Sequence, residues 1–244
     1  EKTSFLFYYA IRRQMVSDVP ICTFLSGGVD SSIVSAVCAE ELKKQGKQLH
    51  TFSFDFVDND KYFKANAFQP SQDRPYVEKM VKHIDSIHHF LECETTKQAD
   101  LLTASVDAHD LPCMADVDSS MLYFCSVVKQ SHKVALTGEC ADEIFGGYPW
   151  FHKKECFDAD TFPWTMDLEA RKVMLSDDFL YELHMNEYVS EAYHNSVAET
   201  PRIDEDTPEE ARRREISYLN LKWFMQTLLD RMDRTSMYSG LEAR

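Results

Sequence analysis

The chain has 244 residues, of which 44% are hydrophobic and 27% are charged, a composition typical of a globular protein with one full-sized core. Its formal net charge of −15 argues against nucleic acid as a partner, because a polyanion needs a basic protein face. The apolar runs are far shorter than the roughly 20 residues that cross a membrane, so we expect no membrane partner. The helical pattern begins within the first residues, so we expect no signal peptide and a cytoplasmic location.

Seven cysteines are scattered along the chain without a C-x-x-C pair. This spacing argues against a zinc or redox motif, and an odd number of dispersed thiols fits a reducing compartment. We expect these cysteines to be small core residues.

The predicted elements alternate between helix and strand over the first 137 residues. Apolar side chains at helical spacing predict a helix over 5–16, and a short apolar run predicts a strand over 20–25. After a Ser/Gly turn we expect, in chain order, a helix at 33–42, a strand at 48–56, a helix at 76–84, a strand at 86–91, helices at 99–108 and 119–130, and a strand at 133–137. Such alternation favours a parallel sheet covered by helices on both faces, with ligands at the carboxyl ends of the strands.

The strand signal ends at about residue 157. The helices predicted beyond it lie at 177–184, 187–198 and 208–229. Thr207 caps the last of them, and acidic residues fill its first turn. We therefore expect an α/β fold with a parallel sheet flanked by helices, followed by a helical C-terminal part. The expected division is a nucleotide-binding core over residues 1–156 and a helical extension of the same domain over 157–244.

The first glycine-bearing motif is Ser26-Gly27-Gly28-Val29-Asp30-Ser31-Ser32, between a predicted strand and a predicted helix. Glycines let successive backbone N–H groups converge on an anion, and the helix N-terminus adds partial positive charge. Asp30 would repel phosphates unless a divalent cation lies between them, so a magnesium ligand is its expected role. An ordinary turn with Asp30 or Ser31 as the helix cap is the plainer alternative. No lysine follows, so this is not the loop that supports cleavage at the γ-phosphate.

The second motif, residues 136–148, also follows a predicted strand, so both motifs can face one pocket. Gly138 permits close approach of the backbone to a nucleotide. Glu139 and Asp142 are three residues apart and would share one face of a helical turn, where two carboxylates beside phosphates need a metal or a proton-transfer task. A helix N-terminus with favourable acidic residues is the alternative. We expect Gly146 and Gly147 to end that helix and to pack closely.

Three other features suggest binding sites less strongly. Adjacent strand residues point to opposite faces, which argues against zinc at the His88-His89 pair. The run Arg212-Arg213-Arg214 stands beside several glutamates and is expected to be a solvated helix face. Trp150 and Phe151 are expected to be packing aromatics.

The first motif resembles the pyrophosphate loop of ATP pyrophosphatases, which cleave ATP between the α- and β-phosphates to adenylate a substrate. The second, Leu136-Thr137-Gly138-Glu139-Cys140-Ala141-Asp142-Glu143-Ile144-Phe145-Gly146-Gly147-Tyr148, resembles the asparagine synthetase signature S/T-G-E-x-x-D-E-x-F-G-G-Y. The end of the chain, residues 233–244, resembles that family's segment ending in G-[LV]-E-A-R. The resemblance runs from about residue 18 to residue 244.

This resemblance implies an adenine nucleotide alpha hydrolase-like fold and ATP-dependent amidation of aspartate to asparagine through β-aspartyl-AMP, with AMP and pyrophosphate as products. It implies ATP and Mg²⁺ as cofactors, with Asp30 and Asp142 on the metal and Glu139 as the catalytic residue. The implied substrate contacts are Asp118, Ser119, Asp233 and Arg234. The implied ATP contacts are Leu25, Ser26, Gly27, Gly28, Asp30, Ser31, Ser32, Ser53, Phe54, Thr137 and Gly138, with the adenine near Ser53, Phe54 and the backbone of Leu25.

The family pattern also includes regions that these residues do not contain. Family members carry an N-terminal glutaminase domain with a nucleophilic cysteine, and their pattern continues past Arg244, so we expect this chain to be a fragment. The expected partners are aspartate, ATP, ammonia and, in the full-length protein, the glutaminase domain, with a homodimer as a candidate assembly. Three alternatives stay open: a relative with another acyl acceptor, such as a β-lactam synthetase, a tRNA-modifying enzyme, and a non-catalytic nucleotide sensor.

Overall fold

The computed structural model describes residues 2–65, 71–112, 115–166 and 168–244. The chain divides into two compact units, residues 1–139 together with 229–244 and residues 140–228. These units divide the chain differently from the two domains expected from the sequence, whose boundary at residue 156 stays a prediction. In the described parts of the chain, no helix is both long enough and apolar enough to cross a membrane.

A parallel sheet of five strands forms the centre of the first unit, in the order β3-β2-β1-β4-β5. Its strands are β1 (Ile21–Phe24), β2 (His50–Phe56), β3 (Ile87–Cys93), β4 (Val134–Leu136) and β5 (Glu242–Ala243). The first four confirm the predicted α/β pattern. The expectation that no strand follows residue 157 is wrong, because β5 pairs with β4 at the very end of the chain. Two residues are too few to carry a periodic signal.

Helices cover both faces of this sheet, as predicted. They are α1 (Lys2–Gln14), α2 (Val29–Lys44), α3 (Asn59–Tyr62), α4 (Arg74–Ile84), α5 (Thr95–Asp100), α6 (Leu102–His109), α7 (Ala115–Val128) and, from residue 229, the end of α14 (Met225–Ser239). The single helix predicted over 99–108 is two helices, because the chain turns at Leu101 between α5 and α6.

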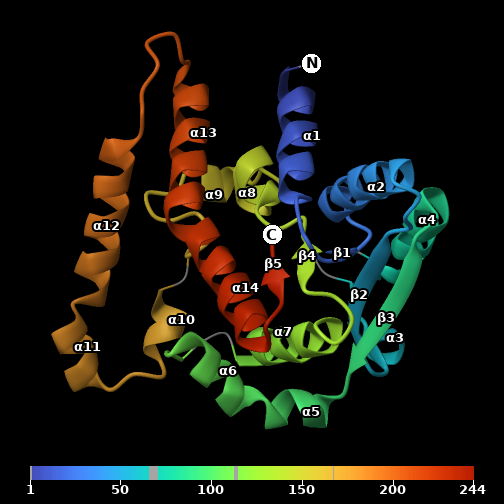
Figure 1. Cartoon of the computed structure of the whole chain (residues 1–244). Helices are drawn as coiled ribbons and strands as arrows, with labels where there is room; N and C mark the ends of the chain where they lie inside the picture. The colour runs from blue at the N-terminus through green and yellow to red at the C-terminus, as the bar shows by residue number, and fades with distance from the viewer. Residues whose placement is uncertain (1, 66–70, 113–114, 167) are drawn as a thin grey trace. The chain divides into compact units, whose positions relative to one another are not determined.

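Alternate residues of β1 enter two separate hydrophobic cores. Ile21 packs with residues of α1 and α2, including Ile11 and Val37. Cys22 and Phe24 belong to a second cluster with Cys125 and Val128 of α7 and Met232 of α14. Figure 1 shows α2 and α7 on opposite sides of the sheet. Burial on both faces explains why the strand reads as a continuous apolar run without alternation.

The second unit is helical among its described residues, in agreement with the predicted helical part. Its helices are α8 (Ala141–Phe145), a 3-10 turn (Pro149–Phe151), α9 (Lys154–Phe157), α10 (Glu169–Lys172), α11 (Asp177–Leu183), α12 (Met185–Glu199), α13 (Pro208–Leu219) and a π-helical turn (Asn220–Phe224) that leads into α14. The predicted cap at Thr207 is confirmed, since its hydroxyl accepts from the backbone of Glu210 while the Glu210 side chain accepts from Thr207. Trp150 is buried and donates to the Asn220 side chain at 3.2 Å, which confirms its packing role.

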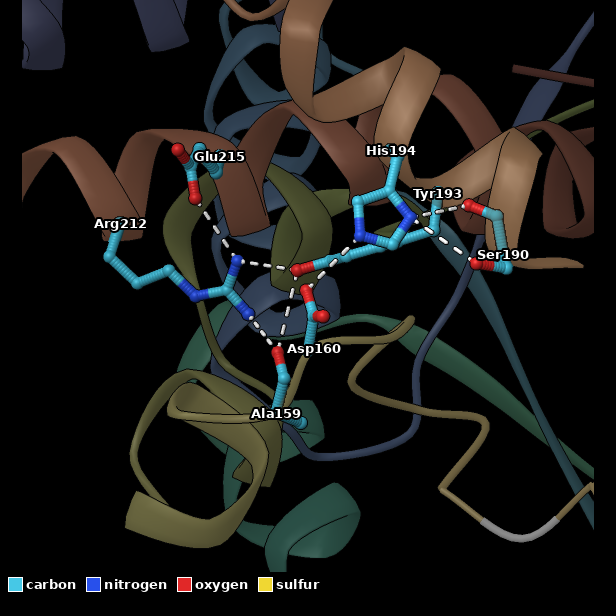
Figure 2. Close-up of polar contacts among 7 residues, drawn as sticks. All are labelled: Ala159, Asp160, Ser190, Tyr193, His194, Arg212 and Glu215. Carbon is cyan, nitrogen blue, oxygen red and sulfur yellow. Dashed lines mark hydrogen bonds and ion pairs between the residues drawn. The ribbon is translucent and has the colours of Figure 1, made fainter.

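Of the arginine run at residues 212–214, Arg213 lies on the solvated face that we expected, 60% exposed and paired with Glu209 at 2.6 Å, whereas Arg212 does not. Arg212 donates to the carbonyls of Phe157 and Ala159, each at 2.7 Å, and to the Tyr193 hydroxyl and the Glu215 carboxylate, each at 3.0 Å. Figure 2 shows the Arg212 and Tyr193 side chains converging near the Ala159 carbonyl. A guanidinium carries five donors in a rigid fork, so it can hold a turn whose carbonyls are far away in sequence.

Candidate active site

The loop Ser26–Ser32, called the phosphate loop after the ligand expected from its sequence, leads from the carboxyl end of β1 into α2. Gly28 is the N-cap of α2 in an extended conformation, and no side chain caps this helix. This excludes the alternative in which Asp30 or Ser31 is the cap. The Ser31 hydroxyl accepts from the Ser26 amide at 3.2 Å and lies 3.0 Å from the Ser26 hydroxyl. Hydroxyls and first-turn amides therefore gather at the positive end of a 16-residue helix, an arrangement suited to an anion.

Gly27 is required by the packing of the loop on α4. Its φ of +82° lies in the left-handed region, and a Cβ at this position would stand 2.8 Å from Tyr76 Cβ and 2.8 Å from the Val77 amide nitrogen. A larger residue would clash with backbone that belongs to the first turn of α4. The loop is therefore held against α4 on this side.

Gly138 holds the loop from the other side. A Cβ there would lie 2.6 Å from the Ser31 amide nitrogen and 2.9 Å from the Asp30 carbonyl carbon. The close approach predicted for Gly138 is thus made to the first turn of α2. The two glycine-bearing motifs, more than 100 residues apart in the sequence, meet backbone to backbone at this point.

A cleft of about 550 Å³ opens beside the phosphate loop, at the carboxyl ends of β2 and β3. Ser26 of the loop lines it together with Ser53 and Phe54, two residues predicted to lie near adenine. The Ser53 hydroxyl donates to the Leu25 carbonyl, and the Leu25 amide donates to the Phe52 carbonyl at 2.8 Å. Both backbone groups of Leu25 therefore bond to β2, which fixes the loop to the wall of the cleft.

The charge of the cleft favours an uncharged ring over a polyphosphate. Among the described residues that line it, one is a cation, Arg74 at the start of α4, whose guanidinium lies 4.4 Å from the centre of the Phe90 ring. Its other charged lining residues are the carboxylates Asp55, Asp58, Asp60, Asp73 and Glu92. Such a wall repels phosphates but leaves an aromatic and apolar surface for a base.

Glu139 follows Gly138 directly and lies beside α14. Its side chain is 15% exposed and accepts from Arg231 Nη2 at 2.7 Å, while the Arg231 side chain is 19% exposed. Burial, and then the negative charge of Glu139, raises the pKa of the Cys125 thiol on α7 to about 12. Glu139 therefore lies at the end of β4, between groups of α7 and α14.

Glu139 and Asp142 do not share a helical face, contrary to our expectation. Helix α8 begins only at Ala141, and Cys140 before it is left-handed with a φ of 73°. The spacing of three residues therefore does not correspond to one helical turn. Asp142 belongs to the second unit.

The two glycines after α8 confirm the expected close packing. Gly146 ends the helix in the left-handed conformation with a φ of 72°, and its amide donates to the Asp142 carbonyl at 2.9 Å. A Cβ on Gly147 would overlap the Asp142 carboxylate. Gly147 thus leaves the space in which this carboxylate lies.

Among the described residues, no group of three or more His, Cys, Asp or Glu side chains could hold a metal ion by itself. Magnesium usually takes one or two protein carboxylates and completes its shell with water and substrate phosphates. His88 and His89 diverge as predicted, to Thr51 Oγ1 at 2.8 Å and to His50 Nδ1 at 3.0 Å. Burial lowers the pKa of His88 to about 4, so it is neutral at pH 7.

The residues predicted to bind substrate lie on α7 and α14. Asp118 is 1% exposed, and its Oδ1 has no hydrogen-bond partner among the described residues, while Ser119 is fully buried. Asp233 is exposed. Arg234 donates to the His109 carbonyl at 2.9 Å and to Asp230 at 2.7 Å, so its guanidinium helps to hold the end of α6.

Comparison with known proteins identifies the family. The sequence profile described as asparagine synthase matches residues 3–244. The chain belongs to the asparagine synthase family. It is 50% identical over 240 residues to the glutamine-hydrolyzing asparagine synthetase 3 of Bacillus subtilis, a match that covers 98% of this chain and 39% of the relative.

More distant relatives match in the same way. Identity is 26% over 203 residues to a glutamine-hydrolyzing asparagine synthetase of Arabidopsis thaliana, covering 71% of this chain and 33% of the relative. Identity is 26% over 217 residues to glutamine-hydrolyzing asparagine synthetase 1 of Saccharomyces cerevisiae, a match that covers 72% of this chain and 38% of the relative. This member of the asparagine synthase family therefore spans about two fifths or less of the length of these relatives.

The sequence analysis did not predict the contacts of three arginines, Arg74, Arg231 and Arg244. Arg74 lines the cleft, and Arg231 donates to Glu139. Arg244 donates to the carbonyls of Gln14 and Val16, each at 2.8 Å, and so ties the end of α1 to the sheet. The sequence carries one signal for Arg231, because the Asp-Arg pair at 233–234 also occurs at 230–231.

Replacing Asp30 tests the phosphate loop of this asparagine synthase chain. Asp30→Ala should weaken magnesium-dependent binding of ATP by about 10-fold or more, because a charge-assisted contact contributes roughly 1.5–3 kcal/mol. Titration calorimetry with Mg-ATP measures the effect, and Asp107→Ala on the exposed face of α6 is the matched control. Equal affinity in the two variants would contradict the assignment.

Proposed function

We propose that this chain is the ATP-using part of an enzyme that converts aspartate to asparagine. The side-chain carboxylate of aspartate attacks the α-phosphorus of ATP, and pyrophosphate leaves to give β-aspartyl-AMP. Ammonia then attacks the acyl carbon, AMP leaves, and one proton of the nitrogen is lost. The observation that carries this proposal is the contact of Gly138 with the first turn of α2, which brings Glu139 next to the phosphate loop.

Several parts of the first unit would act in this reaction. The amides and hydroxyls of Ser26–Ser32 hold the phosphates, and Thr137 and Gly138 back that loop. The cleft beside Ser53 and Phe54 takes the adenine, because its acidic wall disfavours phosphates there. Holding ATP and aspartate in line supplies much of the rate, since phosphoryl chemistry asks for little covalent work from the protein.

Carboxylates provide the remaining functions. When bound, magnesium on Asp30 and Asp142 would neutralise charge on the departing pyrophosphate. Glu139 orients the acyl group or takes the proton of the attacking ammonia. Asp118, Ser119, Asp233 and Arg234 are the proposed aspartate contacts. For Asp118 the support is its buried Oδ1, which has no partner in the part of the chain that the structure describes and could accept from an ammonium group.

The setting of the reaction is also a proposal. Ammonia would come from a glutaminase domain elsewhere in the full-length protein, since two fifths of a relative's length matches this chain and that relative's name includes glutamine hydrolysis. We propose a cytoplasmic location, the domain division at residue 156, and a homodimer as the assembly to test.

The products of the reaction decide between this function and its rivals. Phosphorus NMR of the whole protein with Mg-ATP, aspartate and ammonia should show AMP and pyrophosphate in equal amounts, and none when aspartate is omitted. ADP would contradict the proposal. ATP binding without turnover would favour a nucleotide sensor, and turnover with a different acyl acceptor would favour a β-lactam synthetase-like relative.

A further inference from the structure

Arg231 reaches the proposed catalytic carboxylate from a different part of the chain. It lies on α14, 92 residues after Glu139, and both residues belong to the first unit. The contact joins one nitrogen, Nη2, to one carboxylate oxygen, Oε1, at 2.7 Å. Charge-assisted hydrogen bonds of this length are among the strong ones in proteins.

The backbone of α14 is fixed where it carries Arg231. The Thr235 hydroxyl donates to the Arg231 carbonyl at 2.7 Å, one turn along the helix. Met232, the next residue, is buried in the cluster that contains Ala135 of β4 and Leu241. A packed helix therefore holds the guanidinium against the end of the strand that leads to Glu139.

The surroundings of Glu139 determine what the positive charge of Arg231 does to its carboxylate. Both side chains are more than four-fifths buried, and a buried carboxylate needs a partner to stay charged and in one orientation. On the α7 side the nearby titratable group is the Cys125 thiol, which stays neutral because its pKa is raised to about 12. Arg231 thus supplies positive charge on the side of Glu139 that faces α14.

The contacts of Arg212 show what an arginine with a purely structural role looks like in this chain, and the contact between Arg231 and Glu139 differs from them. Arg212 satisfies two carbonyls, a hydroxyl and a carboxylate, and so ties a turn to two helices. Arg231 makes its contact with Glu139, and its Nε is buried without a hydrogen-bond partner among the described residues. Its geometry is directed at one carboxylate and not at the backbone.

We infer that Arg231 is the positioning residue for Glu139: it holds the carboxylate aimed at the acyl group while touching neither ATP nor aspartate itself. The inference rests on the proposed function, because it needs Glu139 to act in the chemical step. A displacement of about 1 Å in a reacting group can cost on the order of 100-fold in rate. The residue should therefore affect turnover far more than nucleotide affinity.

The test is steady-state kinetics of AMP formation by the whole protein, with aspartate and ammonia, together with titration calorimetry of Mg-ATP. Arg231→Met should lower kcat by about 10–100-fold and change the KM for ATP by less than about 3-fold. Arg231→Lys, which keeps the charge and can make a contact with one oxygen, should turn over at least about 3-fold faster than Arg231→Met. The double variant Arg231→Met/Glu139→Gln should be no more than about 3-fold slower than Glu139→Gln, because both changes remove one function.

Arg12→Met is the matched control, since Arg12 makes an exposed pair with Glu41 at 2.8 Å on the outside of the same unit. It should keep the wild-type kcat. Near-normal turnover of Arg231→Met beside an inactive Glu139→Gln would overturn the inference alone. Additive losses, a lysine variant no better than methionine, or loss of Mg-ATP binding in Arg231→Met would overturn it too. Absence of aspartate-dependent AMP formation in the wild type would overturn the proposed function, and the inference with it.

Discussion

Glu139→Gln is expected to lower kcat for asparagine formation by about 100-fold or more, which is the usual contribution of a positioned acid–base group. The variant should bind Mg-ATP with close to normal affinity. Glutamine has the shape of glutamate and still offers an oxygen to Arg231, so the fold of the loop should survive. What it lacks is the negative charge that takes a proton or orients the acyl group. Such an interaction forms as the bond forms and therefore acts on the transition state.

Two comparison variants show whether the loss is chemical. Asp142→Asn should instead reduce magnesium-dependent use of ATP, because its proposed role is on the metal. Glu41→Gln removes a carboxylate from another arginine pair, which lies on the surface, and should be neutral. Turnover, calorimetry with Mg-ATP and thermal unfolding of all three variants give the answer. If Glu139→Gln turns over normally, or fails only because ATP no longer binds, Glu139 has a structural role.

Much of the fold could be predicted because its signals are local. The buried strand β1 appears as an apolar run, the Ser/Gly turn follows it, and the cap at Thr207 marks α13 in four consecutive residues. Strand β5 carried no such signal, because its two residues are defined by pairing with β4 more than 100 residues earlier. Likewise, Arg212 reads as one of three surface arginines until the carbonyls 53 and 55 residues away are in place.

In the candidate site, too, local features could be predicted and contacts between segments far apart in the sequence could not. Glycines in the two motifs were expected to mark close approach, and the structure places backbone against Gly27 and Gly138. The approach of Gly138 to the first turn of α2 was not foreseen, because it joins segments more than 100 residues apart in the sequence. Helical spacing suggested a shared face for Glu139 and Asp142, but the left-handed Cys140 interrupts the register. Nothing local indicates that a non-glycine residue takes this conformation.

Gly138→Ala should weaken Mg-ATP binding by about 10–100-fold, although residue 138 need not touch the nucleotide. The added Cβ would stand 2.6 Å from the Ser31 amide nitrogen, closer than non-bonded atoms approach, and its neighbours there are backbone atoms that cannot rotate away. Either the first turn of α2 or the end of β4 must shift. Overpacking of this kind costs about 1–3 kcal/mol, and if the loop shifts to relieve it, a loss of similar size in its contacts with phosphate gives the expected change in affinity.

Gly46→Ala separates the clash from a general effect of replacing glycine. Gly46 has a φ of +70°, and its Cβ would meet no atom within 4 Å, so alanine there strains the backbone without displacing a neighbour. It should lower the thermal stability slightly and leave Mg-ATP affinity unchanged. Calorimetry and thermal unfolding of both variants distinguish the two effects. Wild-type affinity in a folded Gly138→Ala variant would mean that the contact between the two motifs does not shape the phosphate loop. The contact of Gly138 with the first turn of α2 would then no longer support the proposed function.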